Sequence, residues 1–73
     1  MSYKDNGNRL RQMRGERSQQ AIASAIGISQ AALAMYESGL RNPRDGIKIR
    51  LAKFFGVRVS DIFFAEDTTN SSI

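Results

Sequence analysis

Residues 18–36, SQQAIASAIGISQAALAMY, contain no charged side chain, although a quarter of the whole chain is charged. Apolar residues recur in this stretch at helical spacing. The first pair is Ile22 and Ile26, and the second, after the glycine at position 27, is Leu33 and Tyr36. Gly27 is suited to end the first of these helices, because glycine adopts a left-handed backbone without steric cost. The stretch therefore predicts two short helices that cross around a tight turn.

The length and the missing residue types exclude most catalytic functions. At 73 residues the chain has room for one domain with one small core. It contains no cysteine and no histidine, so disulfides and the usual zinc and haem ligands are excluded, as are the two commonest catalytic side chains. We therefore expect a binding module that is not an enzyme and that needs no metal, cofactor or small-molecule ligand.

The charge is distributed unevenly along the chain. All eleven lysines and arginines lie in residues 1–58 beside four acidic residues, a balance of +7, whereas residues 59–73 carry three acidic residues and no basic one. A basic body fits a polyanionic partner, although a solvated basic surface would look the same from charge alone. No apolar run approaches the ~20 residues of a membrane span, and the N-terminus lacks the apolar stretch of a signal peptide. We expect a cytoplasmic protein that does not contact membranes.

Three further helices are predicted outside the uncharged stretch. The spacing of Leu10 and Met13 predicts a helix from about residue 8 to residue 14, after a flexible N-terminus over residues 1–7 with an Asn-Gly turn signal. Asp45 favours the start of a helix that Gly56 ends.

Serines mark the other helix starts. Ser18 and Ser29 are suited to cap the two central helices, and Ser60 to cap a last helix that ends at about residue 64. Residues 65–73 are polar and are expected to be disordered. No stretch alternates long enough to predict a strand, so the expected fold class is all-α with five helices.

Three segments in order resemble the Cro/repressor-type helix-turn-helix family, also called the XRE family. They are SQQAIASAIGIS, YESGLRNP and LAKFFGVRVSDIF, and the resemblance covers residues 8–64. It implies one DNA-binding domain over these residues, a compact five-helix bundle of the lambda-repressor-like type. Its recognition helix, about residues 29–37, would enter the major groove of double-stranded DNA.

Four residues are assigned structural roles. Ala23 is small where the two central helices cross, and Gly27 makes the turn between them. By resemblance, Arg14 on the first helix pairs with Glu37 at the end of the recognition helix. Only three residues separate Arg14 from Ser18, a shorter link than in most relatives, which leaves this pairing open.

The resemblance places five side chains at the base edges, namely Ser29, Gln30, Ala31, Ala34 and Met35. Gln30 is the best candidate for a specific contact, because glutamine can make paired hydrogen bonds to adenine. The apolar side chains can touch thymine methyl groups but neither donate nor accept, so we expect modest direct readout and a larger share for DNA shape. An alternative is that the alanines serve only helix propensity.

A second set would contact the phosphates. Gln19 resembles the family position that bonds a phosphate at the start of the second helix. The loop after the recognition helix, which relatives press against the DNA backbone, supplies the others: Ser38, Arg41, Asn42 and Arg44.

The last third of the chain is rich in phenylalanine, and a core this small has little room for all of the apolar residues there. Some are expected in a homodimer interface, with the alternative that they fill the core. The predicted interface residues are Phe54, Ile62, Phe63 and Phe64.

These expectations describe a transcriptional regulator that binds a palindromic operator as a homodimer. Two recognition helices would then lie ~34 Å apart, one turn of DNA. Repression and activation are both compatible with the sequence. An alternative function is a protein-interaction module, such as an antitoxin-like partner, with DNA binding secondary.

Overall fold

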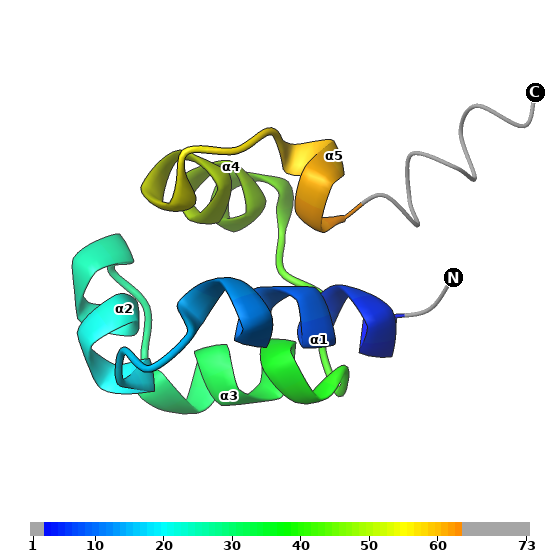
Figure 1. Ribbon diagram of the computed structural model, residues 1–73. Coiled ribbons are helices and arrows are strands. Elements are labelled where there is room, and N and C mark those ends of the chain that lie inside the picture. The colour runs from blue at the N-terminus through cyan, green and yellow to red at the C-terminus, as the bar shows by residue number, and fades with distance from the viewer. Residues whose placement is uncertain (1–2, 64–73) are drawn as a thin grey trace, which may run out of the picture.

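The computed structural model describes residues 3–63, which form five helices and no strand (Figure 1). The all-α fold class is therefore confirmed. None of the helices in these residues has the length and apolar character that a membrane span needs. The helices are α1 (Tyr3–Arg14), α2 (Gln19–Ile26), α3 (Gln30–Ser38), α4 (Asp45–Phe55) and α5 (Val59–Ile62).

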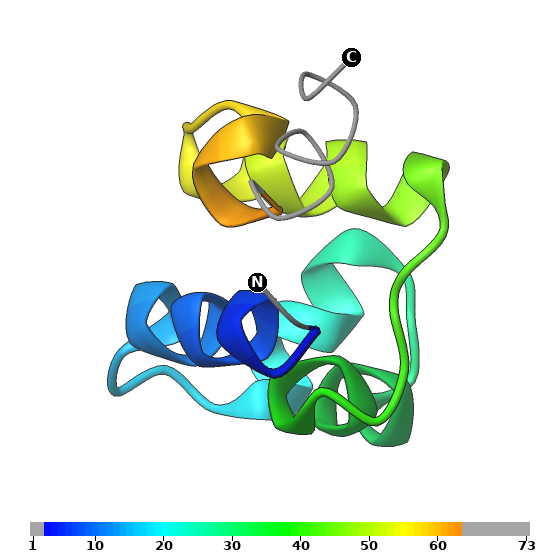
Figure 2. The same cartoon turned by 90° about the vertical axis from the view of Figure 1, so that its right-hand side faces the viewer.

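The helices lie in two layers. In Figures 1 and 2, α1 and α3 lie side by side in one layer, and α4 and α5 form the other. α2 joins the layers at one end, because it packs against both α3 and α4. The most extensive packing in the fold is that of α1 on α3, which fixes the helix that would read DNA.

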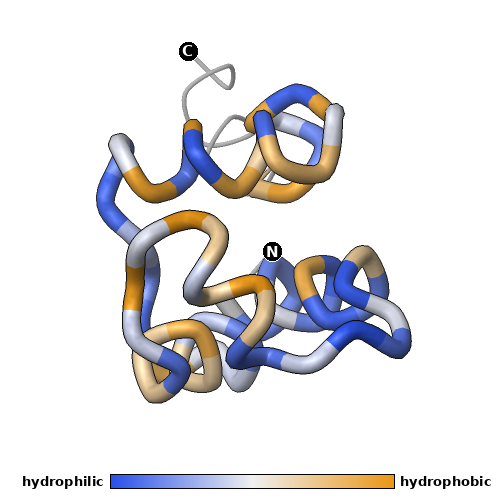
Figure 3. The backbone as a smooth tube through the Cα atoms, turned by 90° about the vertical axis from the view of Figure 1, so that its left-hand side faces the viewer, coloured by the Kyte–Doolittle hydropathy of each residue, from blue (hydrophilic) through white to orange (hydrophobic). Residues whose placement is uncertain are grey.

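The core lies between the layers and takes side chains from every helix. Figure 3 shows hydrophobic and hydrophilic positions interleaved along the helices, as amphipathic packing requires. Each large apolar side chain that is fully buried contributes about 1.5–3 kcal/mol to stability. The core residues are Leu10, Ile22, Ala23, Ile26, Leu33, Leu51, Ala52, Ile62 and Phe63.

The turn between α2 and α3 forms as predicted. The hydroxyl oxygens of Ser18 and Ser29 each accept a 3.0 Å hydrogen bond from the backbone N–H three residues later. Gly27 has φ 81°, and its N–H and that of Ile28 both donate to the carbonyl of Ala23 at 2.9 Å. Local caps therefore set the bounds of both helices.

The first helix begins earlier than predicted, at Tyr3, so the prediction of a flexible segment over residues 1–7 was wrong for residues 3–7. Gly7 lies inside α1, where a Cβ atom would overlap the carbonyl oxygens of Tyr36 and Glu37. This glycine therefore allows close contact between the backbones of α1 and α3, and it does not form a turn.

The last helix also differs from the prediction. It begins at Val59, so Ser60 lies inside the helix and is not its cap. The backbone N–H of Arg58 instead donates to the Asp61 carboxylate at 2.9 Å. This bond satisfies a backbone group at the helix start.

Two predicted interface residues are core residues. Ile62 and Phe63 are 0% and 1% exposed, so the prediction that they contact a partner was wrong and they fill the core instead. Both close the space between α1 and α4, where α5 contacts each helix. Phe64 and the tail over residues 65–73 lie outside the described residues.

Asn6 provides a test of this core. It is 2% exposed, and neither its amide nitrogen nor its carbonyl oxygen has a hydrogen-bond partner within residues 3–63. Because an unsatisfied buried polar group costs about 1–3 kcal/mol, Asn6→Leu should raise the free energy of unfolding by about that amount in urea titrations. Asn8→Leu, at an exposed position of the same helix, is the matched control and should change stability little. A less stable Asn6→Leu variant would contradict the prediction.

Candidate nucleic-acid interface

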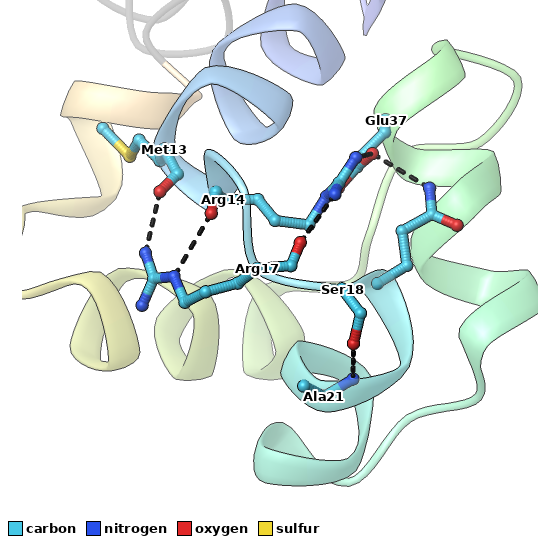
Figure 4. Close-up of polar contacts among 7 residues, drawn as sticks. Met13, Arg14, Arg17, Ser18, Ala21 and Glu37 are labelled. Carbon is cyan, nitrogen blue, oxygen red and sulfur yellow. Dashed lines mark hydrogen bonds and ion pairs between the residues drawn. The ribbon is translucent and has the colours of Figure 1, made fainter.

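A buried carboxylate on the inner side of α3 organises the interface. Glu37 is 2% exposed and accepts two hydrogen bonds from Arg14, Nε to Oε2 at 2.7 Å and Nη2 to Oε1 at 3.0 Å (Figure 4). The predicted Arg14–Glu37 pair is therefore present, and its two parallel bonds fix the relative position of α1 and α3. Hydrogen bonding to Glu37 raises the pKa of Arg14 above its ordinary value.

The short link between α1 and α2 is closed by arginine side chains. Arg14 Nη1 donates to the carbonyl of Arg17 at 2.8 Å. In return Arg17 donates to the carbonyls of Met13 at 2.8 Å and Arg14 at 3.2 Å, which are exposed at the end of α1 (Figure 4). These bonds stabilise the helix end, so a link of three residues is sufficient for the family pairing.

Arg17 also attaches this link to the other layer. Its guanidinium carbon lies 5.5 Å from the ring centroid of Phe54 and 5.3 Å from that of Phe55, within cation–π range. The two rings meet edge to face at 5.2 Å. The end of α1 is thus held against the end of α4.

Gln19 is the first residue of α2, at the predicted phosphate position. Its Nε2 donates to Glu37 Oε1 at 3.0 Å, so the same carboxylate that holds Arg14 also orients this amide. An amide nitrogen carries two hydrogens, and the second can donate to another acceptor. Gln19 is therefore attached to α3 through one N–H of its amide.

Four of the five predicted readout residues are exposed, at the start of α3 or along it. Leu33 and Glu37 are buried on the inner side, at 1% and 2% exposure. Ala31 and Met35 are exposed on the side opposite this buried pair, and Ala34 is half-buried. Ser29, the N-cap, and Gln30, in the first turn, are exposed at the start of the helix. The sole charged residue of α3 is the buried Glu37, so the outer side of this helix carries no charge.

The loop after α3 forms a basic hollow. Its volume is about 350 Å³, and the residues that line it are Tyr36, Arg41, Asn42, Arg44 and Ile47. Three of the predicted phosphate contacts therefore meet at one place. Ser38 does not line the hollow; it is exposed, and its hydroxyl donates to the carbonyl of Met35 at 3.0 Å.

Sequence reasoning missed Tyr36 and Leu40 as surface features. Tyr36 fits the apolar spacing of α3, yet it is only half-buried and lines the basic hollow. Leu40 is 81% exposed beside the predicted phosphate residues. Spacing cannot separate a core tyrosine from one at the rim of a pocket, because both lie on the same helical face.

Among the described residues that were predicted for the homodimer interface, one is exposed and can contact a partner. Phe54 is 39% exposed near the end of α4. Ile49 is 48% exposed on the same helix, five residues earlier. At 100° per residue this spacing puts the two side chains on opposite edges of the outer face of α4, so they do not form one patch.

Comparison with known proteins supports a DNA-binding assignment. The sequence matches the helix-turn-helix family over residues 9–62, which include α2, α3, α4 and α5 and the second half of α1. The matched region therefore contains all the described residues of the interface.

Two curated relatives are regulators of transcription. The chain is 37% identical over 49 residues to an uncharacterized HTH-type transcriptional regulator of Methanocaldococcus jannaschii, a match that covers 67% of this chain and 74% of the relative. It is 30% identical over 63 residues to the cryptic phage CTXphi transcriptional repressor RstR of Vibrio cholerae, which covers 84% of this chain and 57% of the relative. The chain therefore spans little more than half of the second protein. No solved structure matched at a significant level.

The ion pair under α3 can be tested by substitution. Arg14→Met leaves the buried Glu37 carboxylate without its charged partner, so we expect a loss of about 3–5 kcal/mol in unfolding free energy. Arg11→Met, an exposed arginine on the same helix, is the matched control. Because two apolar side chains remove the uncompensated charge, Arg14→Met/Glu37→Met should recover much of the loss. Equal stability of the Arg14 and Arg11 variants would contradict this account.

Proposed function

Because this chain belongs to the Cro/repressor-type (XRE) helix-turn-helix family of DNA-binding transcriptional regulators, we propose that it binds operator DNA as a homodimer, with α3 in the major groove. The observation that carries the proposal is the uncharged, exposed side of α3, which follows Gln19 in the chain and precedes the basic hollow. Operator DNA lies in the cytoplasm of a prokaryotic cell, which is the compartment this function requires.

The features on either side of α3 suit a DNA backbone. Gln19 precedes α3 at the start of α2, and Arg41 and Arg44 follow it in the basic hollow. Phosphate contacts on both sides of a recognition helix set its depth and register in the groove, while base edges supply specificity. In this arrangement Gln30 would donate to and accept from an adenine.

The exposed aromatic residue of the predicted dimer interface, Phe54, supports a homodimer. Phe54 lies at the end of α4, away from α3, so a partner there would leave the recognition helix accessible. A two-fold pair matches a palindromic operator, because each subunit reads one half-site.

Selection from random duplex DNA tests the whole proposal. The purified protein should enrich a palindrome at physiological salt, with half-site centres about 10 base pairs apart, as sequencing of the bound pool will show. Enrichment of a single unpaired half-site would contradict the dimer. Weak binding without any enriched sequence would contradict the regulator and favour the antitoxin-like alternative, in which the main ligand is another protein.

The basic hollow leads to a separate prediction. Arg44→Ala should weaken binding to all DNA sequences about equally and lower the slope of log K against log salt by about one, because one phosphate contact is lost. Lys53→Ala removes the same charge from an exposed position on α4 and should leave the slope unchanged. Equal slopes for the two variants, measured by fluorescence anisotropy over a salt series, would show that Arg44 acts only through net charge.

A further inference from the structure

The outer side of α3 is unusually apolar for a surface that would face DNA. Ala31 and Met35 lie four residues apart, directly opposite the buried pair Leu33 and Glu37. Ala34 is beside them, half-buried.

Hydrogen-bonding side chains occur only at the ends of this face. Ser29 uses its hydroxyl oxygen to cap the helix, and Ser38 donates to the carbonyl of Met35. Gln30 lies at the first position of the helix. The middle of α3, from Ala31 to Met35, therefore presents no side-chain donor or acceptor on its outer side.

In the major groove the thymine 5-methyl group is the base-edge feature that apolar side chains can recognise, since every other feature there is a donor or an acceptor. We propose that the direct contacts of α3 with base edges come chiefly from packing Ala31, Ala34 and Met35 against thymine methyl groups. This proposal rests on the proposed function and specifies its ligand chemistry, namely half-sites with thymines at successive positions.

Helix propensity alone does not explain this surface. Glutamate, lysine and glutamine favour a helix nearly as well as alanine and methionine do, and they are better solvated on an exposed face. Met35 is 36% exposed, so part of a large apolar side chain is in water in the unbound protein. Contact with methyl groups would remove that surface from water.

The shapes of the three side chains suit the contact. Alanine is short, so it allows the backbone of α3 to approach the base edges closely. Methionine is flexible and polarizable, so it can adapt to methyl groups on neighbouring base pairs. Arg14 and Gln19 hold the helix from its inner side through Glu37, so this close approach does not depend on charges on the outer side.

Deoxyuridine substitution tests the proposal directly. Replacing thymine with deoxyuridine removes the methyl group and leaves the base-edge donors and acceptors in place. In the operator obtained by selection, each contacted thymine should lose about fourfold in affinity when replaced, which corresponds to ~0.8 kcal/mol for one buried CH₂ group. 5-Methylcytosine carries the same methyl group. An operator with 5-methylcytosine in place of a contacted thymine should therefore bind the protein more tightly than one with cytosine at that position.

Variants of α3 assign the effect to its side chains. Met35→Gln and Ala31→Ser should each lose sensitivity to deoxyuridine at one position, as a double-mutant cycle will show. Ala25→Ser, at an exposed alanine of α2, is the matched control and should retain full sensitivity. Gln30→Ala should weaken thymine and deoxyuridine operators equally, because its contact is a hydrogen bond.

The outcomes separate this proposal from the function on which it depends. Failure to select any operator would overturn the proposed function. An operator that binds equally well with deoxyuridine throughout would overturn methyl recognition and leave the regulator intact. A deoxyuridine effect that persists unchanged in Met35→Gln and Ala31→Ser would also overturn it, because the methyl groups would then act through DNA shape.

Discussion

The position of the recognition helix depends on the buried carboxylate of Glu37. Arg14 brings α1 to this group through two hydrogen bonds, and Gln19 brings α2 to it through a third. Such bonds are directional, and an unpaired charge at 2% exposure would be costly, so α3 has little freedom to rotate about its own axis. Gly7 adds to this constraint, because it lets the backbone of α1 approach the end of α3.

This arrangement reverses the usual polarity of an amphipathic helix near its C-terminal end. The charged residue of α3 points inward, and alanine and methionine point outward. Binding energy can then come from two separate sources, with phosphate contacts before and after the helix and apolar contacts along it. The link through Arg17 to Phe54 also connects the DNA-facing layer with the surface proposed for dimerisation.

Local signals predicted the helix caps and the exposed side of α3. Ser18 and Ser29 cap their helices, and the phase of α3 places Ala31 and Met35 outward, because caps and helical periodicity depend only on neighbouring residues. The hollow around Tyr36 was not predictable. It forms where the start of α4 lies against the end of α3, and the residue spacing within one helix does not show how two helices pack.

The sequence by itself determined the helix content, the turn at Gly27 and the basic character of the body, since these follow from residue type and local order. Tertiary structure decided the rest. Gly7, read locally as a turn, lies within a helix and lets α3 approach it there, and Ile62, read as a surface residue, is enclosed by α1 and α4. The pairing of Arg14 with Glu37 joins residues 23 positions apart, so only the packed chain could establish it.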